Sequence, residues 1–234
     1  MSSKLQLGLV GKLYKDTIFY VDELELGETN YTVRIEEKLG GAFNILNASL
    51  LNIEPKCFCS GERDAIILSE TKKSQRTSIV SKSSDEGEPN LDIYDSKMDW
   101  LHVLYIDDYY PIDMSRIKSK VSIDFCTDQP RKLYESYIEN SDIVFDSRER
   151  KGLYSKIRSS TPIILHDKMG CECVWMGNVV FKSKIDPIYG LNVNGAGDLF
   201  AAIFIRELVY SDFQTAMEMT STLVTEILKK RSKH

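Results

Sequence analysis

The feature that most constrains the fold of this 234-residue chain is an alternation of apolar runs of strand length with amphipathic segments of helix length. Such alternation is typical of a mostly parallel β-sheet that is covered by helices on both faces. We therefore predict an α/β fold, specifically a Rossmann-like three-layer α/β/α sandwich. The expected strands are residues 5–10, 100–106, 121–125, 143–145 and 162–165, and the expected helices are residues 43–51, 112–117, 132–138 and 149–157.

Two regions interrupt this alternation and indicate a second, smaller sheet. Residues 16–21 and 31–35 read as strands on either side of a turn-rich segment, and residues 76–81 show a similar alternation. We interpret a small sheet beside a parallel core as a β-sheet lid over a binding site.

The chain is long enough for one compact domain. We expect a single domain over residues 1–234, with lid segments near 12–38 and 74–82. The run 81–90, SKSSDEGEPN, contains no apolar residue and is expected to form a loop.

Charge and hydropathy argue against two large classes of protein. The formal net charge of −5 disfavours nucleic-acid binding, which depends on clustered Lys and Arg. The longest strongly apolar windows, such as residues 199–205, are far shorter than a membrane-spanning helix, and the first residues do not read as a signal peptide. We therefore expect a cytoplasmic protein with no nucleic-acid or membrane partner.

Four of the five cysteines form two C-x-C pairs, Cys57 with Cys59 and Cys171 with Cys173. This spacing places both thiols of a pair on one face of a strand. A metal site is one interpretation. Structural thiols are favoured, because zinc sites usually have C-x2-4-C spacing.

A final helix is expected near the C-terminal end. Ser211 and Gln214 have capping-box spacing, and a stripe on one helical face follows them, which we expect to cover the sheet. The stripe consists of Phe213, Met217, Thr220, Leu223, Val224, Ile227 and Leu228.

The segment with the clearest chemistry is residues 192–200, N-V-N-G-A-G-D-L-F, which leads directly into an apolar helical pattern. Gly195 and Gly197 on either side of Ala196 allow a tight turn whose amides point one way, and the start of the helix adds its positive dipole end. Asp198 then lies in the first helical turn, where it could take a proton from an attacking hydroxyl. The alternative is that Asp198 only caps the helix and the glycines form an ordinary turn.

A second glycine-rich turn precedes an earlier helical pattern, at Gly40, Gly41 and Asn44 in L-G-G-A-F-N. Taken alone, a double glycine supports an ordinary turn equally well. Farther upstream, Gly11 and Asp16 follow the first strand, with Asp16 expected where the chain leaves the C-terminal end of that strand. Ligands bind at that end in parallel sheets.

Together these segments resemble the ribokinase-like (PfkB-type) carbohydrate kinase family, as a short and divergent member. The family pattern is an early strand ending in G-x4-D, a G-G-x2-N before the first long helix, and a late D-T-x-G-A-G-D-x-F at a helix start. The resemblance covers nearly the whole chain. The matching residues are Gly11, Asp16, Gly40, Gly41, Asn44, Asn192, Val193, Gly195, Ala196, Gly197, Asp198 and Phe200.

The resemblance implies a kinase that transfers the terminal phosphate of ATP to a hydroxyl of a small polyhydroxy substrate, such as a sugar, sugar acid, cyclitol or nucleoside. On this interpretation Asp198 is the catalytic base, and the amides of Gly195, Ala196 and Gly197 stabilise the transferred phosphoryl group. Asp16, Gly40, Gly41 and Asn44 would bind the substrate.

The cofactor side is also implied by the resemblance. Asp146 and Glu149 look like the family's N-x-x-E element, which makes Glu149 the residue that organises Mg²⁺. Asn192, Asn194 and Gly170 are then expected on the nucleotide side together with Asp146.

Several residues depart from the family pattern. Asn192 and Val193 stand where the family usually has Asp and Thr, which puts its monovalent-cation site in question. Leu165, Asp167 and Gly170 stand where it often has T-x-G-x-x-G, and only 36 residues follow Asp198.

These departures keep a rival interpretation open, a non-catalytic descendant that binds a metabolite or acts as a regulator. The presence of Asp198 beside an anion-binding turn favours the kinase, because a pure binder has no need of a base there. The predicted lid strands would otherwise present an open edge, and family lids often associate, so a homodimer through the lid is also predicted.

Overall fold

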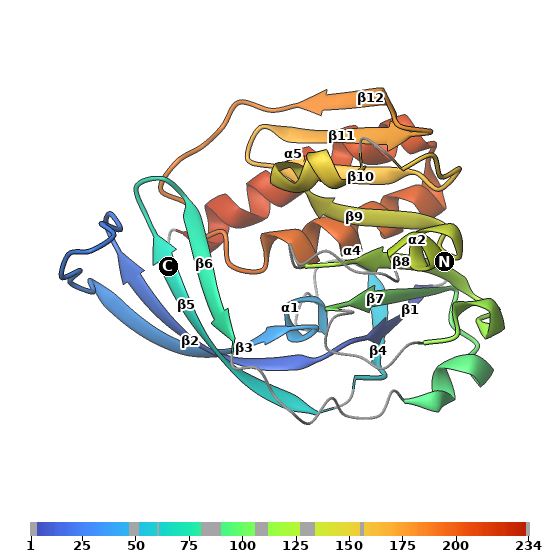
Figure 1. Ribbon diagram of the computed structural model, residues 1–234, viewed down its shortest axis with the longest axis horizontal. Helices are drawn as coiled ribbons and strands as arrows, with labels where there is room; N and C mark the ends of the chain where they lie inside the picture. Colours follow the sequence, from blue (N-terminus) through green and yellow to red (C-terminus); the bar gives the residue numbers. More distant parts are fainter. Residues whose placement is uncertain are drawn as a thin grey trace.

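The computed structural model describes residues 4–46, 52–59, 61–80, 90–105, 112–126, 134–154 and 157–232. Its centre is an eight-stranded sheet in the order β12-β11-β10-β9-β8-β7-β1-β4 (Figure 1). These strands are β1 (Leu5–Val10), β4 (Ile53–Cys57), β7 (Trp100–Leu104), β8 (Lys120–Asp124), β9 (Ile143–Ser147), β10 (Ile163–Asp167), β11 (Gly170–Trp175) and β12 (Asn178–Lys184).

The six strands from β10 to β4 run parallel, whereas β11 and β12 are added antiparallel at one edge. Parallel neighbours need crossover connections, and these bring the C-terminal ends of β1, β7, β8, β9 and β10 to the same edge of the sheet. Residues that follow these strands therefore meet there, although they are far apart in the sequence.

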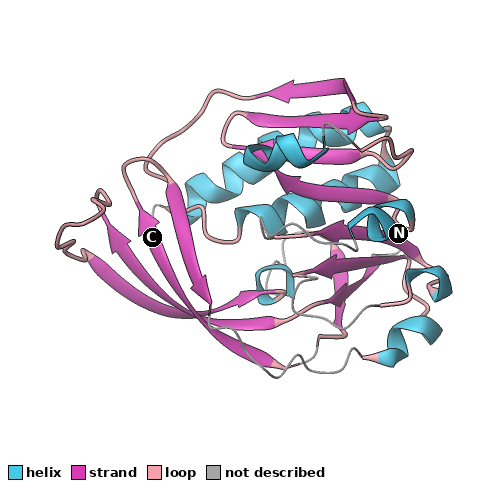
Figure 2. Ribbon diagram, viewed as in Figure 1, coloured by secondary structure: helices cyan, strands magenta, loops and turns pink. Residues whose placement is uncertain are grey.

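Helices cover both faces of the large sheet, as predicted. The long helices α4 (Ala196–Tyr210) and α5 (Phe213–Arg231) lie on one face, next to the short α1 (Phe43–Leu46) (Figure 2). On the other face lie α2 (Tyr134–Glu139) and α3 (Lys151–Tyr154), together with 3₁₀ turns at Leu91–Asp95, Met114–Arg116 and Arg148–Arg150. Two apolar cores result, one on each side of the sheet, which is the predicted three-layer arrangement.

A separate four-stranded sheet projects from one side of the molecule (Figure 1). Its order is β3-β2-β5-β6, with β2 (Leu13–Val21), β3 (Arg34–Gly41), β5 (Glu62–Glu70) and β6 (Gln75–Val80). One face of it buries Tyr14, Ile18 and Tyr20, which alternate along β2, and the Tyr14 ring lies 5.0 Å from that of Tyr105 at the end of β7. This face therefore looks toward the C-terminal edge of the large sheet.

Two local predictions were wrong. Residues 112–117 form only a 3₁₀ turn, Met114–Arg116, and Asp113 caps it through its carboxylate. The last helix begins one residue later than the expected capping box, because Asp212 accepts the amide of Thr215 at 2.9 Å. Ser211 instead donates its hydroxyl to the carbonyl of Glu207, at the end of α4.

The strand expected at 31–35 is displaced, because β3 begins only at Arg34 and continues to Gly41. The helix expected at 43–51 begins at Phe43, and residues 47–51 lie outside the described ranges, as do Ile106 and residues 81–89 of the expected loop. All five cysteines are free thiols, and Cys171 and Cys173 are buried in β11. No helix in the described part is long and apolar enough to cross a membrane.

Candidate active site

The start of α4 is held in an unusual backbone conformation. Gly195 is the residue before the helix, with φ +72° in the left-handed region, and a Cβ added there would lie 2.6 Å from Cγ of Asn44. Glycine is therefore required both for the turn and for the close approach of α1. The turn and the second glycine-rich segment, far apart in the sequence, thus meet at this point.

The amides of the turn are not all equally available. The amide of Ala196 donates to the carbonyl of Val193 at 3.0 Å, and that of Leu199 donates to Gly195 at 3.1 Å. Between them, the amides of Gly197 and Asp198 donate to no acceptor among the described residues. An anion at this helix start would thus be bound mainly by the latter two.

Asp198 lies in the first turn of α4 and is only 4% exposed. The amide nitrogen Nδ2 of Asn44 donates to its Oδ2 at 2.8 Å. Burial raises the pKa of Asp198, while the hydrogen bond from Asn44 and the positive charge of Arg76 lower it. The result is an oriented carboxylate whose proton affinity is higher than that of a free aspartate.

The predicted substrate-binding residues lie next to this carboxylate. Asp16 lies within β2, in the small sheet, rather than at the C-terminal end of β1 as expected. Its carboxylate lies over Gly40, where an added Cβ would be 2.0 Å from its Oδ2. Burial raises the pKa of Asp16, and the charges of Lys38 and Arg76 lower it. Gly41 follows in β3, just before the helix that carries Asn44.

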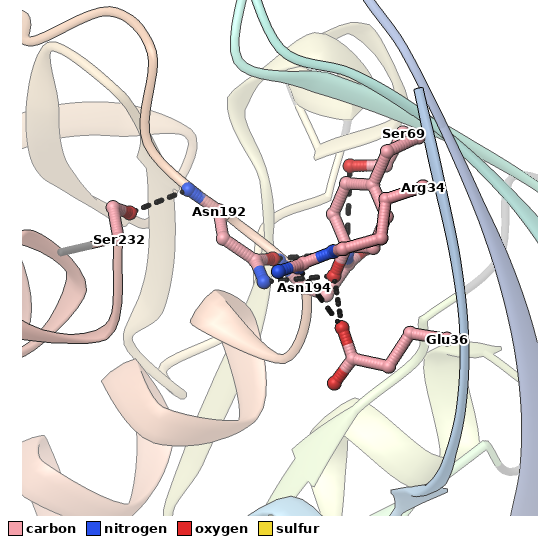
Figure 3. A network of polar contacts seen from close by, with 7 residues as sticks. Arg34, Glu36, Ser69, Asn192, Asn194 and Ser232 are labelled. Atoms are coloured by element: carbon pink, nitrogen blue, oxygen red, sulfur yellow. Dashed lines mark hydrogen bonds and ion pairs between the residues drawn. The ribbon is translucent and has the colours of Figure 1, made fainter. Parts of the chain in front are cut away.

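A polar network ties the segment before the turn to the small sheet (Figure 3). The Nδ2 group of Asn192 donates to the hydroxyl of Tyr20 at 2.9 Å, and its main-chain amide donates to Ser232 at 2.8 Å. Asn194 donates from Nδ2 to Oδ1 of Asn192 at 2.9 Å and to Ser69 at 3.4 Å. The glycine-rich turn is therefore fixed to both the small sheet and the end of α5.

This network also tests the monovalent-cation site that the resemblance implies. The oxygen of Asn192 accepts two hydrogen bonds from Asn194, and its nitrogen acts as a donor. Cations are bound by oxygen ligands, which include the amide carbonyls of asparagine. Among the described residues, Asn192 and Asn194 offer no carboxylate, and the one amide oxygen that accepts no hydrogen bond is the buried Oδ1 of Asn194.

A cavity of about 650 Å³ opens beside Asp198 and Gly197. Its wall contains two residues that the sequence analysis did not assign to the site, Asp124 and His166, which lie at the ends of β8 and β10 at the C-terminal edge. They flank Gly197, where an added Cβ would lie 3.4 Å from Cε1 of His166 and 3.9 Å from Oδ2 of Asp124. For Asp124 the signal was available, because it ends a predicted strand at the edge where ligands bind.

The pKa values of Asp124 and His166 are shifted in opposite directions. Burial, and then the carboxylates of Asp146 and Asp198, raise the pKa of Asp124 to about 7. Burial, and then the charges of Arg150 and Arg148, lower the pKa of His166 to about 4, so its imidazole is neutral at pH 7. The His166 ring also stacks on Phe200 with centroids 4.7 Å apart, which fixes its orientation.

The predicted cofactor residues are divided between the cavity and the core. Glu149 is exposed and Gly170 is buried, and both line the cavity. Asp146 is 1% exposed, does not line the cavity, and accepts hydrogen bonds from Arg150 and Tyr154. Asp146 is therefore already satisfied by protein groups, and it acts on the cavity through its charge on Asp124.

Comparisons with known proteins give information on the fold alone. No family model matches the sequence, and no curated protein sequence matches it. Among solved structures, a ribokinase from Cryptococcus neoformans var. grubii serotype A in complex with ADP is similar, with 14% identity and a TM-score of 0.68, covering 95% of this chain and 93% of that chain.

Two further solved structures are similar to this chain. A Burkholderia thailandensis nucleoside kinase in complex with inosine has 11% identity and a TM-score of 0.69, covering 93% of this chain and 88% of that chain. An Arabidopsis thaliana ribokinase complexed with ribose and ATP has 13% identity and a TM-score of 0.68, covering 96% and 93%. The chain therefore has a ribokinase-like fold.

Proposed function

We propose that this protein is a kinase that transfers the terminal phosphoryl group of ATP to a hydroxyl of a small polyhydroxy substrate, with Asp198 as the catalytic base. The observation that carries the proposal is the placement of Asp198 at the wall of a cavity. It is a buried carboxylate, oriented by Asn44 at 2.8 Å, beside helix-start amides that donate to no acceptor among the described residues. The solved structures with this fold include kinases of ribose and of nucleosides, which supports the same reaction class.

Each group of residues has a separate role in the proposed reaction. Asp16, Gly40, Gly41 and Asn44 hold the acceptor, and Asp198 removes the proton from its reacting hydroxyl. The hydroxyl oxygen then forms a bond to the terminal phosphorus as the bond from phosphorus to the leaving phosphate oxygen breaks. The helix-start amides of Gly197 and Asp198 stabilise the charge on the transferred group, which shifts the role predicted for the amides of residues 195–197, because that of Ala196 donates to Val193.

The cavity supports a nucleotide as the donor. Its volume is within the range of small-molecule sites, and one part of its wall is apolar, as a nucleobase requires. The apolar part is formed by Ile185, Ile188, Leu191, Val224 and Leu228. Gly170 and Glu149 lie in the same wall, and Asn192 and Asn194 hold the turn beside it.

The acidic side chains of the wall fit Mg²⁺ shared with the donor phosphates. Asp124 and Glu149 face the cavity, and the raised pKa of Asp124, near 7, marks a place where a cation would relieve the repulsion between carboxylates. Mg²⁺ is usually bound by one or two carboxylates plus phosphates and water, and no closed three-ligand cluster exists among the described residues. Bound there, the ion would neutralise phosphate charge.

The proposal is tested by calorimetry and an acceptor screen on the same folded protein. ATP, ADP and a non-hydrolysable analogue are titrated in the presence of Mg²⁺, and ADP formation is then followed with sugars, sugar acids, cyclitols and nucleosides. We expect nucleotide binding and acceptor-dependent ADP formation. Absence of binding by all three nucleotides would refute the kinase. Binding without turnover for any acceptor would favour a metabolite-binding or regulatory role.

A further inference from the structure

The buried face of the small sheet carries positive charge next to the candidate site. Lys38 in β3 is the register partner of Asp16 in β2, so both side chains leave the sheet on the same face. That face is the one that buries Ile18 and Tyr20, and it looks toward Asp198. Lys38 is therefore a neighbour of the carboxylate assigned to the acceptor.

Two more cations act on the same carboxylates. Arg76 in β6 lines the cavity, and its charge acts on both Asp16 and Asp198. Arg231, at the end of α5, lies near enough to lower the pKa of Lys38 further, after burial, and it is itself influenced by Asp198. Three cations from three different elements thus converge on two carboxylates.

Among the described residues, these cations have only a neutral side-chain partner: the guanidinium of Arg76 donates to the hydroxyl of Ser78 at 3.1 Å. Within the described ranges, no salt bridge involves Lys38, Arg76 or Arg231. Arg34, on the same strand as Lys38, differs because its charge already has partners in the sheet. Its guanidinium pairs with Glu36 at 3.0 Å and lies 4.2 Å from the centre of the Tyr20 ring.

Arg231 and Lys38 lie near different parts of the proposed site, one near the transferred phosphoryl group and the other near the acceptor. Arg231 is influenced by Asp198, at the helix start that would hold the transferred phosphoryl group. The carboxylates that act on Lys38 are those of Glu36 and Asp16. The charge of Lys38 is therefore placed for the acceptor, and a neutral sugar would leave its half-buried ammonium group without a salt bridge among the described residues.

We propose that the acceptor is an anionic polyhydroxy compound, a sugar acid or a sugar phosphate, whose carboxylate or phosphate binds Lys38 and Arg76 while Asp16 and Asp198 take its hydroxyl groups. The proposal rests on the proposed kinase function. Charge-assisted hydrogen bonds to such a group are stronger than those to neutral hydroxyls, and they would select the acceptor by its charge.

The test compares matched neutral and anionic acceptors: D-glucose with D-gluconate, and D-ribose with D-ribose 5-phosphate. We expect kcat/KM to be at least about tenfold higher for one anionic member than for its neutral partner, as one charged hydrogen bond can supply. The two pairs also distinguish a carboxylate from a phosphate. A neutral member that is used as well as its anionic partner in both pairs would overturn the proposal.

A variant of Lys38 tests whether this side chain binds the anionic group of the acceptor. Lys38→Met should raise the KM for the anionic acceptor by about tenfold or more and leave the KM for ATP unchanged. Lys15→Met is the matched control, because Lys15 is in the neighbouring strand on the opposite face and pairs with Glu62 at 2.7 Å. An equal effect of Lys38→Met on ATP and acceptor would contradict the assignment.

Calorimetry separates this inference from the proposed reaction. If gluconate or ribose 5-phosphate binds the wild type, binds Lys38→Met more weakly and yet is never phosphorylated, the anionic site stands and the kinase fails. If neutral sugars are phosphorylated and neither anionic compound is preferred, the kinase stands and the anionic site fails. If no compound of either kind binds or reacts, both are refuted.

Discussion

At the scale of single residues, the candidate site combines a buried carboxylate, the proposed base, with a hydrogen-bond donor that lowers its pKa. Asn44 and Asp198 are 154 positions apart, and they are joined by one hydrogen bond of 2.8 Å. Without that bond, burial would raise the pKa of Asp198 still further. The proposed role of Asp198 as a base would thus depend on a residue from the opposite end of the chain.

Asn44→Ala should move the acid limb of the pH profile of kcat/KM to higher pH. A base works only when it is deprotonated, and removal of the donor raises the pKa of Asp198, so activity is lost at a higher pH than in the wild type. Asn140→Ala is the control, because Asn140 is exposed and its side chain donates to the carbonyl of Ser136. An acid limb at the wild-type pH would show that Asn44 does not tune the base.

Asp16→Ala should raise the KM for the acceptor by roughly tenfold or more, with little change in the KM for ATP, since one charged hydrogen-bond acceptor is lost. Gly40→Ala should act in the same direction, because its Cβ would lie 2.0 Å from Oδ2 of Asp16. Thr17→Ala, on the opposite face of β2, serves as the control. Equal increases for both substrates would mean that Asp16 supports the sheet instead.

The site residues recognised from the sequence are those whose signal is local. Glycines around a helix start and an aspartate in its first turn can be read from one segment, as with Gly195 and Asp198. His166 was missed because its position depends on strands that meet only through the sheet order, whereas Asp124 had a usable signal at the end of a predicted strand. Arg76 was missed for the same reason as His166, since it reaches the cavity and acts on Asp16 and Asp198 only through the packing of the small sheet against the large one.

At the scale of elements, the start of α5 shows how closely two candidate caps can compete. Ser211 and Asp212 are adjacent, and both residue types are good N-caps. The structure uses Asp212 for the cap, while the hydroxyl of Ser211 satisfies the last turn of α4 through the carbonyl of Glu207. The local pattern predicts the helix, and the end of the preceding helix decides its first residue.

Asp212→Ala should therefore lower the melting temperature more than Ser211→Ala does. Asp212 accepts both the amide of Thr215 at 2.9 Å and its hydroxyl at 2.8 Å, so the substitution leaves two donors without that partner. We expect a fall of about 2–4 °C for Asp212→Ala, as is usual for loss of a cap in a chain of this size. A larger fall for Ser211→Ala in parallel thermal melts would restore the capping box predicted from the sequence.

Four strands were not predicted individually, and each has a physical reason. The sequence of β5 does not alternate because the exposed Ile66 lies between the buried Ala65 and Ile67, although the burial of the strand does alternate. The exposed β12, at the sheet edge, has few buried residues to give it a pattern. The antiparallel β11 and the edge strand β4 are defined by their pairing partners. The parallel centre was predicted because its runs are continuously apolar, as burial on both faces requires.

At the scale of the whole molecule, the small sheet has one face turned to the site and an opposite face that carries an apolar patch. Ile35, Leu39, Ile66 and Ile79 are 57%, 41%, 44% and 55% exposed, and Ile66 and Ile79 are register partners. A patch of this kind on a sheet with two open edges, β3 and β6, is typical of an association surface.

We predict that this patch pairs two copies of the chain, as a lid-to-lid homodimer. Light scattering should show a dimer, and Ile66→Glu should shift it toward the monomer by placing a charge in the patch. Val180→Glu is the control, because Val180 is 41% exposed on β12 in the other sheet. A monomer at every working concentration of the wild type would refute the dimer.

The central claim is that Asp198 is the base of a phosphoryl transfer, and kcat of Asp198→Asn tests it most directly. Asparagine keeps the size and can still accept the bond from Asn44, while a buried carboxylate with a raised pKa costs stability at neutral pH. We expect an unchanged or higher melting temperature, nearly unchanged nucleotide affinity, and a kcat lower by about 10²–10⁴-fold. A folded Asp198→Asn protein that retains wild-type kcat would contradict the account.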